Sequence, residues 1–165
     1  MLLEETENKI CVVIGASHAG VNCAFALRKE GWEGRIILFD ANPELPYHRP
    51  PLSKGYLTTK DGKDSVSLKP FQSYEKEHVE LHLGVQVNQI DRKEKRIFYG
   101  AGSTQDYDTL VIATGASALI PPIPGLKSSQ NMFPLRTMTD VLNIKTALGE
   151  NKNQKVVVIG AGYIG

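Results

Sequence analysis

Two glycine-rich segments constrain the fold of this chain more than any other feature, because each directly follows a short run of apolar residues. The first is Gly15–Gly20 (Gly-Ala-Ser-His-Ala-Gly), and it follows Ile10–Ile14. The second is Gly160–Gly165 (Gly-Ala-Gly-Tyr-Ile-Gly), and it follows Val156–Ile159. A buried strand that runs through such a turn into a helix forms the phosphate-binding unit of dinucleotide-binding folds. The sequence therefore predicts two units of this kind.

The first unit has all the parts of a βαβ element. Ile10–Ile14 and Arg35–Asp40 are continuous apolar, β-branched runs, which is typical of parallel strands covered on both faces. Between them, residues 18–30 follow a helical spacing. Asp40 stands twenty residues after Gly20, where a carboxylate accepts hydrogen bonds from an adenosine ribose and disfavours a 2′-phosphate. An ordinary residue at the end of a strand is the alternative reading of Asp40.

The rest of the chain combines proline-rich segments with short predicted elements. The proline-rich residues 41–72 have few apolar positions, and a loop of this length in a compact domain is usually functional. Residues 116–131 contain three prolines and indicate a domain boundary. The remaining expected elements are a short helix at 73–80, an antiparallel hairpin at 81–90 and 95–100, a strand at 107–113, a helix at 139–148 with Thr139 or Asp140 near its N-cap, and a strand at 156–159.

Composition excludes several functional classes. A net charge of +1 gives no bulk attraction to nucleic acid or membranes, and no apolar run reaches the length of a membrane span. The acidic N-terminus does not resemble a secretory signal. Cys11 and Cys23 match no redox or zinc spacing, and the four histidines have no carboxylate pattern that indicates a metal. We therefore expect a cytoplasmic protein without a metal site and without disulfides.

Pro46–Lys54 carries the chemistry of the long loop. Two adjacent prolines stiffen the backbone, so they can form a rigid wall beside a flat ring. Lys54 can place a positive charge near an anionic ring, and Arg49 can bind a phosphate or carboxylate. By composition alone the segment is also an ordinary proline-rich loop. The same choice applies to Lys54, Lys60, Lys63 and Lys69, which either dock an acidic partner or are solvated.

Five motifs in order carry a resemblance to a known family. They are GASHAG after the first strand, RPPLSK at Arg49–Lys54, LVIATGA at 110–116, PLRTMTD at 134–140, and VVIGAGYIG at 157–165. In this order and spacing the chain resembles the FAD-dependent pyridine nucleotide-disulfide oxidoreductases. It is most similar to the branch of ferredoxin, putidaredoxin and rubredoxin reductases and the apoptosis-inducing-factor relatives. The resemblance runs from Ile10 onward.

The resemblance implies an α/β fold. It consists of a Rossmann-like FAD-binding domain with an antiparallel hairpin insertion over residues 1–115, followed by the truncated start of a second, NAD(H)-binding Rossmann domain over 116–165. Lys54 would lie near the reactive edge of the flavin. The implied cofactor-binding residues are Gly15, Ser17, His18, Ala19, Gly20, Asp40, Arg49, Pro50, Lys54, Val87, Ala113, Thr114, Gly115 and Arg136 for FAD, and Gly160, Gly162 and Gly165 for NAD(H). In close relatives the ribose acid stands one position later, here at Ala41. The alternative reading of His18 is a surface residue at a helix start.

The resemblance also implies the reaction. The stretch after Asp40 has no C-x-x-x-x-C, so disulfide-reductase chemistry is not expected. Electrons would pass from NADH through FAD to a small iron–sulfur protein of the ferredoxin or rubredoxin type. A non-catalytic FAD module or an apoptosis-inducing-factor-like regulator is the alternative, and a plain single-nucleotide dehydrogenase is disfavoured. We expect the 165-residue chain alone to be inactive, with Val156–Ile159 an exposed edge strand prone to self-association.

Overall fold

The computed structural model describes residues 6–59, 62–149, 154–160, 162 and 164 as two compact units. The first unit consists of Met1–His48 and Ser67–Gly115, and the second of Arg49–Val66 and Ala116–Gly165.

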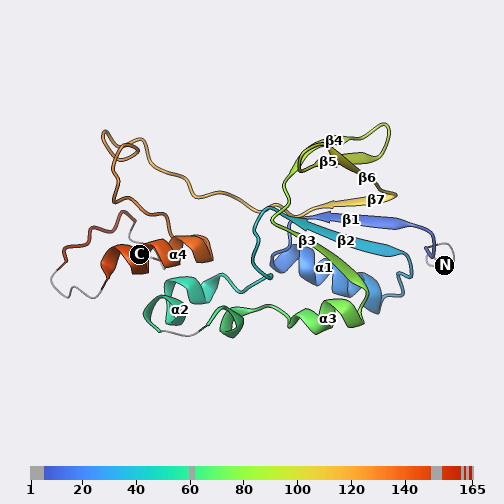
Figure 1. The fold of residues 1–165 in the computed structure, drawn as a ribbon, viewed down its shortest axis with the longest axis horizontal. Helices are drawn as coiled ribbons and strands as arrows, with labels where there is room; N and C mark the ends of the chain where they lie inside the picture. Colours follow the sequence, from blue (N-terminus) through green and yellow to red (C-terminus); the bar gives the residue numbers. More distant parts are fainter. Residues whose placement is uncertain (1–5, 60–61, 150–153, 161, 163, 165) are drawn as a thin grey trace. The chain divides into compact units, whose positions relative to one another are not determined.

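A four-stranded parallel sheet forms the centre of the first unit, with strand order β3-β2-β1-β7 (Figure 1). Its strands are β1 (Ile10–Ile14), β2 (Arg35–Asp40), β3 (Val79–Leu83) and β7 (Thr109–Ile112). Helices α1 (His18–Lys29) and α3 (Phe71–Lys76) cover one face. Side chains such as Val13, Ala24, Leu38 and Tyr74 form the core on that side, so the continuous apolar runs are buried as predicted.

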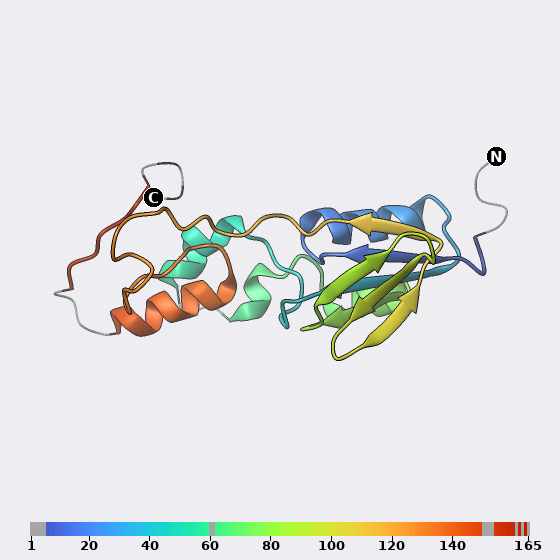
Figure 2. The same ribbon diagram turned by 90° about the horizontal axis from the view of Figure 1, so that it is seen from above.

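An antiparallel sheet covers the opposite face of the parallel sheet (Figure 2). It consists of β4 (Val87–Asp91), β5 (Arg96–Tyr99) and β6 (Ser103–Asp106), in the order β4-β5-β6. Ile97 of β5 packs against Val12, Ile37 and Phe39 of the parallel sheet. The predicted α/β class with an antiparallel insertion is therefore confirmed.

One part of the predicted hairpin was wrong. Residues 81–83 do not belong to the antiparallel sheet, because they are part of strand β3, which pairs in parallel with β2. β3 also includes residues 79–80, the end of the predicted helix at 73–80. The alternating pattern continues across Gly84, but this glycine has a φ of 69° and separates β3 from β4. The two strands on either side of it consequently join different sheets.

The regular secondary structure described in the second unit is helical. They are η1 (Pro50–Ser53), α2 (Gly55–Thr58), η2 (Lys63–Val66) and α4 (Met138–Leu148). α4 packs on η1, and the buried side chains of this unit include Leu52, Tyr56, Met138 and Val141. Lys145 of α4 donates from Nζ to the carbonyl of Thr59 at 2.8 Å. This contact fixes the α4 helix against the end of α2.

The N-cap of α4 differs from the two predicted residues. Thr137, not Thr139 or Asp140, is the N-cap, and its hydroxyl accepts from the amide N–H of Asp140 at 3.1 Å. The Asp140 carboxylate in turn accepts from the amide of Thr137 at 2.8 Å. This is a capping box, in which an acid at the third helical position satisfies the backbone of the cap residue.

The strand predicted at Val156–Ile159 does not form. These four residues have no strand conformation, and their side chains are 57–86% exposed. An apolar, β-branched run has strand propensity, but a strand forms only where neighbouring backbone accepts and donates its hydrogen bonds. No such neighbour is present within the described part of the chain.

Candidate functional site

The order of the parallel strands defines where a ligand can bind in the first unit. From β1 the chain adds β2 and then β3 on one side, whereas β7 lies on the other side of β1. This reversal is a topological switch point, and ligands of open α/β sheets bind at the carboxyl ends of the strands that flank it. The carboxyl end of β1 leads into Gly15–Gly20, and that of β7 leads into Ala113–Gly115. Both predicted loops therefore lie at the same edge.

Two glycines of the first loop are required by the close approach of backbone. Gly15 has a φ of 104°, and a Cβ there would lie 2.3 Å from the carbonyl oxygen of Ala113. A Cβ on Gly20 would lie 1.9 Å from the carbonyl oxygen of Gly15. Real Cβ atoms do not come this close to backbone, so any side chain at either position displaces the turn or the helix. Gly15 permits the turn, and Gly20 permits the packing of α1 on it.

Helix α1 begins at this loop with its positive end unoccupied by acidic side chains. Ser17 is the N-cap, its hydroxyl makes no capping bond to the helix, and the first turn contains no acid. The amide groups at the start of a helix and its macrodipole attract an anion. Ala19 in this turn is exposed.

Asp40 at the end of β2 holds the loop in place. Its Oδ2 accepts from the amide of Ala16 at 2.6 Å, and its Oδ1 accepts from the amide of Asn42 at 2.8 Å. The amide of Gly15 donates to the carbonyl of Phe39 at 2.7 Å. Two hydrogen bonds thus fix the loop to β2, and one of them ends on Asp40, the residue that was predicted to bind the ribose.

The turn after β7 completes this edge of the sheet. The amide of Ala113 donates to the carbonyl of Ile14 at 2.8 Å, and Thr114 and Gly115 follow as exposed residues. Gly115 has a φ of 68°, which glycine adopts at little cost. Val87, the remaining predicted residue of this unit, begins β4 and pairs with Tyr99 of β5.

Two histidines lie in contact beside the loop, and the sequence predicted only one of them as a site residue. His18 Nε2 lies 3.1 Å from His48 Nδ1, and their ring centroids are 5.1 Å apart. His18 was a predicted cofactor residue, but His48 was not. The two residues are thirty positions apart in the sequence. Their contact depends on the path of the proline-rich loop, and no local pattern in the sequence gives that path.

The other predicted flavin residues belong to the second unit. Arg49 donates from Nη1 to the carbonyl of Arg136 at 3.0 Å, so two of them are held together. The Arg136 amide donates to Asp140 at 3.0 Å, within the cap of α4. Pro50 begins η1, and Lys54 is exposed, with its Nζ 3.3 Å from Ser53 Oγ.

The described residues of the second glycine loop lie outside any helix. Gly160 has a φ of 126°, and no described atom beyond the chain neighbours lies within 4 Å of a Cβ built on Gly160 or Gly162. Gly165 lies outside the described residues. Within the described ranges, no group of three or more histidine, cysteine or acidic side chains is arranged to hold a metal ion. No helix in those ranges has the length and apolar character needed to span a membrane.

Comparison with known proteins identifies relatives of this chain. Residues 9–165 match the pyridine nucleotide-disulphide oxidoreductase family. Putidaredoxin reductase of Pseudomonas putida is 39% identical over 160 residues, which are 96% of this chain and 37% of that protein. Rubredoxin-NAD(+) reductase of the same species is 38% identical over 154 residues, 93% of this chain and 39% of that protein. The chain thus spans less than two fifths of these relatives.

Solved structures agree with this assignment. The reductase in a covalent putidaredoxin reductase–putidaredoxin complex superposes with a TM-score of 0.78 and 36% identity, over 86% of this chain and 34% of that one. The ferredoxin reductase for the CYP199A2 system of Rhodopseudomonas palustris superposes with a TM-score of 0.80 and 31% identity, over 86% of this chain and 34% of that one. The predicted resemblance is confirmed, and the chain belongs to the pyridine nucleotide-disulphide oxidoreductase family.

Proposed function

We propose that the chain forms the FAD-binding part, and the start of the NAD(H)-binding part, of an oxidoreductase that passes electrons from NADH to a small iron–sulfur protein. The observation that carries this proposal is the loop at the switch point. It contains two glycines at positions where a Cβ would clash with backbone, and it leads into a helix whose first turn has no acid. The names of the relatives, which are reductases of putidaredoxin and rubredoxin, support the reaction. We further propose a cytoplasmic location.

The residues present fit a dinucleotide such as FAD. The start of α1 supplies positive potential and N–H donors for a diphosphate, and Gly15 and Gly20 permit the close backbone packing that forms this turn. When bound, FAD supplies a two-electron acceptor for hydride that can release electrons one at a time. The residues proposed to hold it in the first unit are Gly15, Ser17, His18, Ala19, Gly20, Asp40, Val87, Ala113, Thr114 and Gly115.

The second unit contributes the proposed flavin residues. Arg49, Pro50, Lys54 and Arg136 would line the ring system, with Lys54 as the catalytic cation at its reactive edge. An exposed ammonium beside a flavin stabilises negative charge that develops on the ring during reduction. The link from Arg49 to the Arg136 carbonyl supports a shared role for these two residues.

The proposed domains follow the same division. Residues 1–115 would form the FAD-binding domain, and 116–165 the start of the NAD(H)-binding domain, where Gly160, Gly162 and Gly165 would receive the second dinucleotide. The partner would be a carrier of the ferredoxin or rubredoxin type.

A charge substitution at Ala19 tests diphosphate binding without disturbing the fold. We expect Ala19→Glu to weaken FAD binding at least about tenfold, because a carboxylate at the helix start repels the diphosphate. The same carboxylate interacts favourably with the helix dipole, so thermal stability should be unchanged or slightly higher. Flavin fluorescence titration measures the affinity, and circular dichroism measures the melting temperature.

Ala19→Gln is the matched control, since it adds the same bulk without charge and should retain most of the affinity. Equal FAD affinity in the wild type and Ala19→Glu would refute the proposed site. Reduction of a rubredoxin or a [2Fe–2S] ferredoxin by NADH, measured with full-length protein, then tests the reaction. FAD binding without any such turnover would favour the non-catalytic alternative.

A further inference from the structure

The peptide group between Gly15 and Ala16 is held at both of its polar atoms. Its carbonyl oxygen packs against Gly20, where a Cβ would lie 1.9 Å away. Its N–H, which belongs to Ala16, donates to Asp40 Oδ2 at 2.6 Å. Because the carbonyl and the N–H of a peptide group lie in one plane, these two contacts together fix the rotation of that plane.

Gly15 does not fix this plane by itself. Its φ is 104°, and a Cβ there would lie 2.3 Å from the carbonyl oxygen of Ala113, so glycine is required. Glycine, however, adopts a wide range of backbone angles at little cost. The Gly15 amide donates to the carbonyl of Phe39, but this bond holds only the peptide group before Gly15. The Asp40 carboxylate therefore supplies a restraint after Gly15 that glycine itself lacks.

The Asp40 side chain is turned toward the protein backbone. Its Oδ2 serves Ala16, and its Oδ1 accepts from the amide of Asn42 at 2.8 Å. The main chain of Asp40 is fixed as well, since its carbonyl accepts from the amide of Val85 at 2.9 Å. Hydrogen bonds from N–H groups to an ionised carboxylate are among the stronger ones in proteins. Each oxygen of this acid is thus engaged in holding the chain around the loop.

We propose that Asp40 is a positioning residue for FAD, which acts through the Gly15–Ala16 peptide and not through a bond to the adenosine ribose. It holds the turn before α1 in the shape that receives the diphosphate, so the entropy of ordering this turn is lost on folding and not on binding. The inference rests on the proposed function, because the ligand is FAD. It replaces the ribose contact that the position of Asp40 in the sequence predicts.

Asp40→Ser separates the two bonds of the carboxylate. The serine hydroxyl can accept from the Asn42 amide, as in turns that begin with serine, but it is one bond too short to reach Ala16 as well. We expect this variant to bind FAD at least about tenfold more weakly than the wild type, the value of one hydrogen bond to a charged group. Asp40→Asn keeps the length of the side chain and one acceptor oxygen, so it should lose less affinity. Fluorescence titration of full-length protein measures the dissociation constants, and melting temperatures confirm folding.

Asp108→Ser is the matched control. Asp108 Oδ2 accepts from the amide of Ile10 at 2.7 Å, so this carboxylate holds backbone at the start of β1, whereas the glycine loop follows its end. The control loses a bond of the same kind but should bind FAD within about twofold of the wild type. Equal losses of affinity in Asp108→Ser and Asp40→Ser would overturn the proposal, because they would reflect a general loss of stability.

An analogue of FAD distinguishes positioning from ribose binding. FAD built on 2′,3′-dideoxyadenosine lacks both hydroxyls that a ribose-binding acid receives. The ratio of the dissociation constants of the analogue and of FAD should therefore agree within about twofold between the wild type and Asp40→Ser. A ratio at least about fivefold smaller in Asp40→Ser would show that Asp40 binds the ribose, and it would overturn the proposal while leaving the FAD site intact.

The Ala16 amide gives a signature of the loop itself. In full-length protein freed of FAD and labelled with ¹⁵N-alanine, its proton should exchange with solvent at least about tenfold faster in Asp40→Ser than in the wild type or Asp108→Ser. An unchanged rate in Asp40→Ser would contradict the proposal, because the carboxylate would then not restrain this peptide. A wild-type protein that binds no FAD would refute the proposed function and this inference together.

Discussion

Tyr74 places a polar hydroxyl group in an otherwise apolar core. Its side chain is 1% exposed and meets the ring of Phe25 edge-on, with centroids 5.4 Å apart. Its hydroxyl has no hydrogen-bond partner within the described residues. Burial raises the pKa of this phenol to about 12. A buried hydroxyl without a partner loses its bonds to water and gains none in return.

We predict that Tyr74→Phe leaves the free energy of unfolding unchanged or raises it by about 1 kcal/mol, because it removes the unpaired hydroxyl and keeps the ring. Tyr47→Phe is the matched control. Its hydroxyl accepts from Asn42, so its removal should lower the stability by about 1 kcal/mol. Urea denaturation measures both. A larger loss for Tyr74→Phe than for Tyr47→Phe would contradict the assignment of an orphan hydroxyl.

Cys11 makes stability depend on alkaline pH. Burial, with a smaller effect from Cys23, raises the pKa of the Cys11 thiol from 9.0 to about 11. A folded-state pKa above the unfolded value means that stability is complete below pH 9 and falls as the pH rises toward 11. Across this interval wild type should lose about 2 kcal/mol more than Cys11→Ala, which has no thiol. Equal pH dependence of urea unfolding in the two proteins would contradict this prediction.

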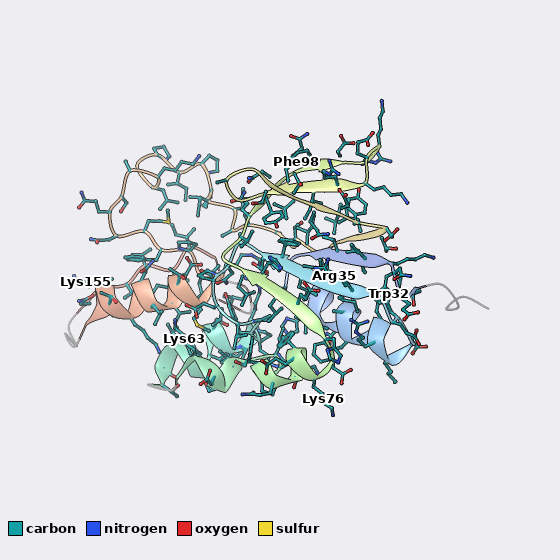
Figure 3. All side chains as sticks on the ribbon, turned by 45° about the vertical axis from the view of Figure 1, so that its right-hand side comes forward. Trp32, Arg35, Lys63, Lys76, Phe98 and Lys155 are labelled. Atoms are coloured by element: carbon teal, nitrogen blue, oxygen red, sulfur yellow. The ribbon has the colours of Figure 1, made fainter. Side chains whose placement is uncertain are left out.

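At the scale of elements, Arg28 joins three segments of the first unit. Its guanidinium donates to the carbonyls of Trp32 at 2.6 Å, Gly34 at 2.7 Å, Glu77 at 2.8 Å and His78 at 2.9 Å. These bonds connect the end of α1 with the turn before β2 and with the turn between α3 and β3. Figure 3 shows Trp32 beside the start of β2. One side chain thus closes the end of the sheet opposite to the glycine loop.

We predict that Arg28→Ala lowers the free energy of unfolding by about 3 kcal/mol, because four carbonyls lose their donor. Arg28→Lys should recover only part of this loss, since an ammonium has three donors and no planar fork. Arg92→Ala, at an exposed position in the turn after β4, is the control and should change stability by less than about 0.5 kcal/mol. Full recovery by lysine would show that charge rather than hydrogen-bond geometry is important.

The elements that the sequence predicted well are those specified by their own residues. The bounds of β1 and β2 followed from continuous β-branched runs, and Gly15 and Gly20 from the motif between them. The errors occurred where pairing with a distant segment determines the structure. β3 belongs to the parallel sheet only because it pairs with β2. Val156–Ile159 has strand propensity, but no neighbouring strand pairs with it within the described residues. His48 and the contacts of Asp40 depend in the same way on how the chain folds back, which spacing alone does not reveal.

At the scale of the whole molecule, the two glycine loops differ in what surrounds them. The first has a strand before it and a helix after it, whereas the described residues of the second, Gly160 among them, lie in neither. We therefore predict that the 165-residue chain binds FAD but does not oxidise NADH in a dye-reduction assay, while full-length protein does both. NADH-dependent dye reduction by the 165-residue chain at the full-length rate would disprove this.

The hydrogen bonds around the first loop have a consequence for the speed and entropy of association. Phe39 and Asp40 hold the loop from one side, and the backbone of Ala113 confines it on the other. Its shape is therefore set when the sheet forms, and the conformational entropy of the turn is lost during folding. An incoming nucleotide would meet a preorganised surface. Little reordering of the backbone would then slow association or reduce the affinity for the nucleotide.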